Sequence, residues 1–191
     1  MFKELMRLDG KILLWIQNNV RPLLPDGAIK GITYLGEAGW LAIAVCAVLL
    51  LIPKTRRIGI MCSCSLAATF LICNGVIKVL VGRTRPYETV EGLRRLVGKQ
   101  PDTSFPSGHS SSSFSVAVVI FRNTRRRIGV PVLILAFLIA LSRLYVGVHY
   151  PSDVIFGILF GSLFALITCR LWSRYFAKKD KLHDTAVREE K

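Results

Sequence analysis

Long apolar runs separated by short basic clusters constrain this chain more than any other feature of its sequence. The runs cover residues 32–52, 58–81, 107–121, 128–146 and 154–176. A helix of about 20 apolar residues spans the hydrocarbon core of a bilayer, and the run at 107–121 is the shortest of the five. The sequence therefore predicts an all-α fold, an integral membrane helical bundle with five transmembrane helices.

The N-terminal region carries a different pattern. Residues 2–20 place apolar side chains at nearly helical spacing with charged residues between them, and Pro22 then interrupts the helix. This pattern is typical of an amphipathic helix that lies on the membrane surface, and a helix here that crossed the bilayer would be a sixth span. We therefore divide the chain into an interfacial helix over 1–30, a membrane domain over 31–176 and a charged cytoplasmic tail over 177–191.

The charge pattern indicates which partners the chain binds and how its helices are oriented in the membrane. Hydrophobic residues make up 52% of the chain, yet 26 Lys and Arg face 12 Asp and Glu, a net charge of +14. A soluble nucleic-acid binder can be this basic, but its charges would not alternate with long apolar runs, so we expect membrane lipids and no nucleic acid as partners. Basic clusters follow the first, third and fifth runs. By the positive-inside rule they are cytoplasmic, which puts the loop over 82–106 outside a multi-pass cell-membrane protein.

The cysteines give no indication of a metal site. All five lie in apolar runs, and Cys62 and Cys64 have neither a second pair nor histidines at ligand spacing. They fit the behaviour of small buried hydrophobic residues. We expect no metal and no cofactor.

The first of three polar clusters ends the second apolar run. Lys78 and Arg85 are seven residues apart, or two helical turns, and would share one face if the helix continued through both. Basic residues at the end of a span commonly extend to lipid headgroups, so this cluster alone does not indicate chemistry.

The second cluster opens the third apolar run with Ser107, Gly108 and His109. A helix start offers free backbone N–H groups, and a small Gly beside a hydroxyl makes such a start suited to holding phosphate. His109 alone could be an ordinary interfacial histidine.

The third cluster joins the fourth and fifth runs and contains Arg143, His149 and Asp153. A carboxylate that follows a histidine can hold one ring nitrogen and raise the basicity of the other. An isolated Asp at a helix start more often compensates the helix dipole.

Taken together, the three clusters bring cations, two histidines and a carboxylate to one membrane face. Ionisable residues at membrane depth indicate function. These residue types also form a complete set for phosphoryl transfer: cations for the oxyanions, a nucleophile with an orienting acid, and a second histidine for protons.

The motifs KxxxxxxRP, PSGH and SRxxxxxHxxxD, running in this order from Lys78 to Asp153, resemble the signature of the type-2 phosphatidic acid phosphatase family. That family belongs to a superfamily shared with vanadium haloperoxidases. The resemblance implies a metal-independent membrane lipid phosphatase with His149 as nucleophile, Asp153 as its partner and His109 as general acid. It also implies five phosphate-binding residues: Lys78, Arg85, Ser107, Gly108 and Arg143. The first thirty residues lie outside the motif match and carry no site residue over.

The resemblance implies hydrolysis of a lipid phosphate or diphosphate through a phospho-histidine intermediate. Candidate substrates are undecaprenyl diphosphate, phosphatidylglycerophosphate, phosphatidic acid and lipid A phosphates. The first leads narrowly, although some such enzymes carry Asp in place of Gly108. Three alternatives remain open: a lipid phosphotransferase, a vanadium-dependent haloperoxidase, and a catalytically silent lipid-binding protein. The apolar spans disfavour the second, and the intact His109, His149 and Asp153 disfavour the third.

Overall fold

The computed structural model describes the backbone of residues 2–189, and the side chains of residue 4, residues 6–37 and residues 39–175. The described backbone forms helices, turns and loops and contains no β-strand, which confirms the predicted all-α class.

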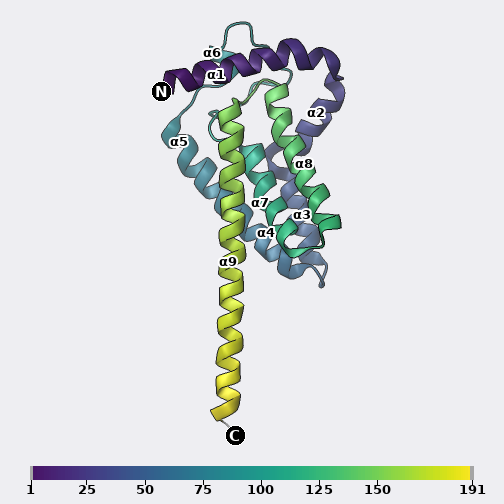
Figure 1. Ribbon diagram of the computed structural model, residues 1–191, viewed down its shortest axis with the longest axis vertical. Coiled ribbons are helices and arrows are strands. Elements are labelled where there is room, and N and C mark those ends of the chain that lie inside the picture. Colours follow the sequence, from purple (N-terminus) through teal and green to yellow (C-terminus); the bar gives the residue numbers. More distant parts are fainter. Residues whose placement is uncertain (1, 190–191) are drawn as a thin grey trace.

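The core of the molecule is a bundle built around one central helix (Figure 1). This helix, α7 (Gly108–Asn123), packs against α4 (Arg56–Thr69), α8 (Arg126–Tyr145) and α9 (Pro151–Glu189). Its buried apolar side chains join two clusters of core residues, one toward α4 and one toward α8. The outward faces of the surrounding helices expose many large apolar side chains, as a surface in contact with lipid does.

The described chain confirms three or four membrane-spanning segments, and the full count of five or six stays a prediction. Three segments of the described chain are long and apolar enough to cross a bilayer: Arg56–Thr89, α8 and Pro151–Tyr175. A fourth is obtained if α2 (Asp26–Leu35) and α3 (Trp40–Leu51) form one bent span. The remaining predicted span, α7, has only 16 residues. At about 1.5 Å per residue it is about 24 Å long, shorter than a hydrocarbon core of about 30 Å.

The predicted continuous span over 32–52 is broken. α2 and α3 meet at an angle of 50°, with a short 3₁₀ turn at Glu37–Gly39 between them. Gly39 adopts φ of +73°, which glycine tolerates best. A Cβ on Gly36 would lie 2.8 Å from the His109 ring, so the break brings the backbone directly against this histidine.

The second apolar run also deviates from a regular α-helix. α4 continues as a π-helical segment, η4 (Phe70–Ile77), and then as a single turn, α5 (Lys78–Val81). Gly82 ends the helix with φ of +56°, so Arg85 lies beyond it in extended backbone. The helix therefore does not continue from Lys78 to Arg85, and the condition under which the two residues would share one helix face is not met.

The N-terminal helix, α1 (Phe2–Trp15), lies across the end of the bundle that also holds α6 (Pro86–Thr89) and the start of α9 (Figure 1). Its outer side exposes Leu8 and Trp15, while Asp9 and Leu13 are buried. An amphipathic helix is present as predicted, and it is not among the segments that could cross a membrane in the described chain. The division of the chain at residues 30 and 176 stays a prediction.

Close contact between α7 and α9 fixes the relative position of their starts. A Cβ on Gly161 would lie 2.3 Å from the Ser111 carbonyl oxygen, and one on Gly157 would lie 2.7 Å from that of Ser107. Small residues let two membrane helices approach this closely. The contact sets the start of α9, which carries Asp153, beside the start of α7, which carries His109.

Candidate active site

The three polar clusters meet at the end of the bundle that α1 covers. A cavity of about 670 Å³ opens there, between the broken first span and the second apolar run. Its polar end is lined by five of the predicted site residues: Lys78, Arg85, Gly108, His109 and His149.

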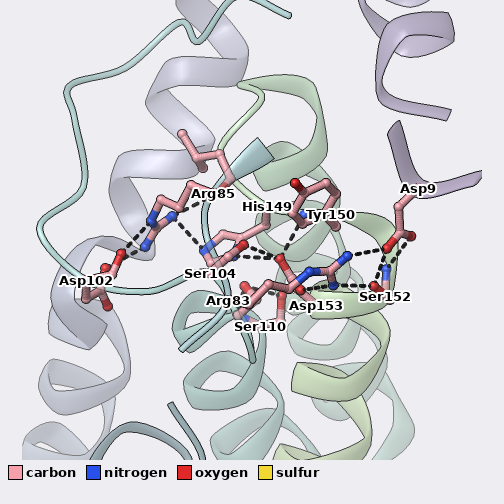
Figure 2. A network of polar contacts seen from close by, with 12 residues as sticks. Asp9, Arg83, Arg85, Asp102, Ser104, Ser110, His149, Tyr150, Ser152 and Asp153 are labelled. Atoms are coloured by element: carbon pink, nitrogen blue, oxygen red, sulfur yellow. Dashed lines mark hydrogen bonds and ion pairs between the residues drawn. The ribbon is translucent and has the colours of Figure 1, made fainter. Parts of the chain in front are cut away.

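His149 lies in the connection between α8 and α9 and is almost fully buried. Its Nδ1 is 3.6 Å from Asp153 Oδ2, slightly beyond hydrogen-bond distance, and makes no hydrogen bond within the described chain. Its Nε2 is 3.4 Å from Arg85 Nη1 (Figure 2). One ring nitrogen therefore faces a carboxylate and the other faces a cation that lines the cavity.

Asp153 is held rigidly in the first turn of α9. Its carboxylate accepts hydrogen bonds from Arg83 Nη1 at 2.6 Å, from the Tyr150 backbone N–H at 2.9 Å, and from the Ser104 hydroxyl. Three donors and no exposure to solvent leave this carboxylate one preferred orientation, with Oδ2 toward His149.

Burial lowers the pKa of His149 to about 4. The Asp153 carboxylate opposes this shift, and the positive charges of Arg85 and Arg143 add to it. At neutral pH the imidazole is therefore uncharged, which is the form in which a ring nitrogen has a lone pair to donate.

Lys78 and Arg85 converge on a carboxylate that the sequence analysis did not single out. Asp102, in the loop before α7, pairs with Lys78 Nζ, and Arg85 Nη2 lies 2.5 Å from its other oxygen. Burial raises the pKa of Asp102, but the hydrogen bond and charge of Lys78, with those of Arg85, outweigh this and hold it at about 2. The two cations thus already bind an oxyanion, and the Asp102 side chain remains 47% exposed.

Arg143 reaches the same region from the last turn of α8. Its side chain is buried, and Nη1 donates to Thr33 Oγ1 at 2.7 Å. Nε and Nη2 have no hydrogen-bond partner within the described residues. A buried guanidinium with two unused donor atoms is suited to binding an oxyanion.

The start of α7 supplies the second histidine. Ser107 is the N-cap of the helix, and its hydroxyl accepts hydrogen bonds from Ser110. A Cβ on Gly108 would lie 3.9 Å from Lys78 Nζ, so the absence of a side chain leaves the space beside this cation open. His109 Nε2 is buried without a hydrogen bond, 3.9 Å from Glu37 Oε2.

The structure thus brings most of the predicted residues to one cavity, with Asp153 directly behind His149. Ser107 and Arg143 are close by but do not line the cavity. In the part of the chain that the structure describes, no three His, Cys, Asp or Glu side chains are placed to hold a metal ion. The role of each residue stays a prediction at this point.

Sequence reasoning missed four residues of the polar network: Asp9, Arg83, Asp102 and Ser104. Arg83 lies in the loop over 82–106, and Asp9 is one of the charged residues between the apolar positions of residues 2–20. For two of the four, the sequence offers a signal in the sign of the side-chain charge: Asp9 and Asp102 are acidic residues in a basic chain.

Several known proteins resemble the chain in sequence or in fold. A family model described as PAP2 superfamily matches residues 58–177, which include every predicted site residue but not Asp9. An undecaprenyl-diphosphatase of Sulfolobus acidocaldarius is 35% identical over 140 residues, covering 72% of this chain and just under two thirds, 66%, of that relative.

Two solved structures share the fold along most of the chain. LpxE of Aquifex aeolicus superposes with a TM-score of 0.74 at 26% identity, covering 84% of this chain and 93% of that one. A PAP2 type phosphatidylglycerolphosphate phosphatase of Bacillus subtilis superposes with a TM-score of 0.72 at 25% identity, covering 88% and 86%.

The burial of His149 has a measurable consequence. We expect its ring nitrogens to keep the ¹⁵N chemical shifts of a neutral imidazole as the pH falls below 6.5, and to protonate only near pH 4. Nuclear magnetic resonance of protein labelled at its three histidines checks this, with His149→Gln assigning the signal. A midpoint at 6.5 or above would contradict the buried, neutral ring.

Proposed function

The chain belongs to the PAP2 superfamily, and from this membership and the geometry of the cavity we propose that it is a membrane lipid phosphatase that works through a phospho-histidine intermediate. The observation that carries the proposal is His149 itself. It is buried and uncharged, with a fixed carboxylate at one ring nitrogen and a cation-lined cavity at the other.

In the first step, the phosphate of the substrate replaces the Asp102 carboxylate between Lys78 and Arg85. Asp153 favours the tautomer of His149 with its proton on Nδ1, which leaves the Nε2 lone pair free to attack phosphorus. His109 acts in its protonated form, which the negative charge of the bound phosphate favours. The Nε2–P bond forms, the P–O bond to the lipid breaks, and protonated His109 donates its proton to the departing oxygen and becomes neutral.

In the second step, water attacks the phospho-histidine and His109 takes a proton from this water. The N–P bond breaks, inorganic phosphate leaves, and both histidines return to their starting states. Asp153 stabilises the positive charge that the His149 ring carries while it is bonded to phosphorus. The cations supply the charge neutralisation for which phosphoryl-transfer enzymes often use a divalent metal.

The shape of the cavity supports a lipid as substrate. Away from the histidines, its wall is formed by apolar side chains that include Ile43, Leu66 and Phe70 from α3, α4 and η4. A phosphorylated headgroup at the polar end would place its hydrocarbon tail along this wall. A small soluble phosphate ester would gain nothing from it.

Among lipids, we propose a polyprenyl diphosphate such as undecaprenyl diphosphate as the leading substrate, with phosphatidylglycerophosphate and phosphatidic acid as the other candidates. Relatives named for the first two are among those that the chain resembles. The open space that Gly108 leaves beside Lys78 is also where a second phosphate group could bind.

We place the catalytic end of the bundle on the extracytoplasmic face, because the basic ends of three apolar runs lie at the opposite end. In a cysteine-free version of the chain, single cysteines at Glu91 and Lys99 should react with an impermeant thiol reagent in intact cells. Cysteines at Arg57 and Arg126 should react only after the membrane is opened. The reverse pattern would put catalysis in the cytoplasm.

The two histidines should respond differently to the leaving group. Phosphatidic acid releases an alkoxide unless the oxygen is protonated, whereas a prenyl diphosphate and an aryl phosphate release groups that tolerate negative charge. We therefore expect His109→Ala to lose far more of the phosphorylation rate on phosphatidic acid than on the other two, by about 10²-fold or more. His149→Ala should be inactive on all three substrates.

The readout for this comparison is the pre-steady-state burst of the leaving group, because His109 also acts in the second step. All assays contain EDTA, since the mechanism uses no metal. Equal impairment of the burst by His109→Ala across the three substrates would exclude His109 as the general acid. Complete loss of wild-type activity in EDTA with rescue by magnesium would exclude the mechanism as a whole.

A further inference from the structure

The N-terminal helix contributes a buried carboxylate to the neighbourhood of the catalytic residues. Asp9 lies on the inner side of α1 with only 2% of its surface exposed, although the family match begins at residue 58. An ionised side chain is seldom buried without partners, because removing it from water is costly. Asp9 is accordingly bonded through both of its oxygens.

The first partner of Asp9 is Arg83. Arg83 Nη2 donates to Asp9 Oδ2 at 2.8 Å, and Nη1 of the same guanidinium donates to Asp153 Oδ1 at 2.6 Å (Figure 2). The guanidinium also lies 3.9 Å from the centre of the Tyr150 ring. One buried arginine thus links the carboxylate of α1 to the carboxylate that faces His149.

The second partner of Asp9 is the first turn of α9. The Ser152 backbone N–H donates to Asp9 Oδ1 at 3.1 Å, and the Ser152 hydroxyl donates to Oδ2. The first N–H groups of a helix have no acceptor within the helix, and a side chain from another element can satisfy them. Asp9 therefore caps the helix turn in which Asp153 lies.

We propose that Asp9 is a positioning residue for the His149–Asp153 pair, acting through Arg83 and through the start of α9. This inference rests on the proposed function of that pair. Asp9 and Arg83 do not line the cavity, so they act on the catalytic residues and not on the substrate.

The charge of Asp9 matters as much as its hydrogen bonds. With Asp9 present, Arg83 is shared between two carboxylates, and the three groups sum to one negative charge available to the His149 ring. Without it, Arg83 would neutralise Asp153 alone. The positive charge that His149 gains when it bonds to phosphorus would then be less well stabilised.

The opposite side of α1 faces away from the bundle and exposes Leu8, Ile12 and Trp15. The helix that supplies Asp9 is therefore the helix whose apolar side is available to the lipid surface. Asp9 joins this interfacial helix to the catalytic pair by a buried ion pair.

The test compares steady-state kinetics of variants on one lipid substrate. Asp9→Asn keeps the shape of the side chain and removes its charge, and should lower kcat by about 10- to 100-fold with KM unchanged. Asp9→Glu keeps the charge but displaces it, and should fall between Asp9→Asn and the wild type. The matched control is Glu4→Gln, which removes an exposed carboxylate from the same helix and should leave both constants unchanged.

A double-mutant cycle separates positioning from loss of stability. If Asp9 acts through Arg83, Asp9→Asn should cost far less activity in an Arg83→Gln background than in the wild type. Fully additive losses, or a wild-type kcat in Asp9→Asn, would overturn the inference. If Asp9→Asn does not fold, Asp9→Glu decides: a wild-type kcat in that variant also overturns it.

The ¹⁵N signal of His149 gives a readout that does not depend on turnover. The charged and titratable groups facing its ring are Arg85, Arg143 from α8, His109 from α7 and Asp153 from α9. Loss of the Asp9 charge should move protonation of His149 to lower pH, whereas simple loosening of the site would move it up toward 6.5. An upward shift would contradict positioning by charge. If the wild type has no phosphatase activity but Asp9→Asn still shifts protonation of His149 to lower pH, the proposed function is refuted and the coupling stands.

Discussion

The buried ion pair between Arg83 and Asp153 is the interaction on which the rest of the site depends. It joins the loop after α5 to the first turn of α9. Arg83 also pairs with Asp9 on α1 and lies over the ring of Tyr150, the residue that follows His149. Removing one partner of such a pair costs about 3–5 kcal/mol, because the other charge stays buried and unpaired. The network therefore holds three segments that are far apart in the sequence in one arrangement.

The helix packing beneath this network sets where His109 and Asp153 lie. Gly161 lets α9 touch the backbone of α7, so the starts of the two helices come together and bring His109 and Asp153 to one end of the bundle. The break between α2 and α3 then opens a cavity with an apolar wall next to the cations. In the proposed function, a phosphate would bind at the polar end of this cavity and a hydrocarbon tail would lie along its apolar wall.

The sequence predicted the all-α class, the family and the residues that meet at the cavity, because ordered motifs at the ends of apolar runs must lie on one face. It did not predict the contact of Asp9 with Arg83, which lies 74 residues away and leaves no periodic pattern. Helical spacing alone also did not show whether the helix reaches Arg85, and Gly82 ends it before that residue. Hydropathy predicted one span over 32–52, but the chain bends between α2 and α3, where Gly36 approaches His109. Hydropathy does not report such a tertiary contact.

A covalent bond between phosphorus and His149 is the central claim, and rapid-quench labelling tests it most directly. Protein mixed with a prenyl diphosphate carrying ³²P in its terminal phosphate should incorporate the label within the first turnover. The bond should be labile in acid and stable in alkali, and the label should be recovered on the peptide that contains His149. Leaving-group release at full rate with no label on the protein, or label on any other residue, would contradict it.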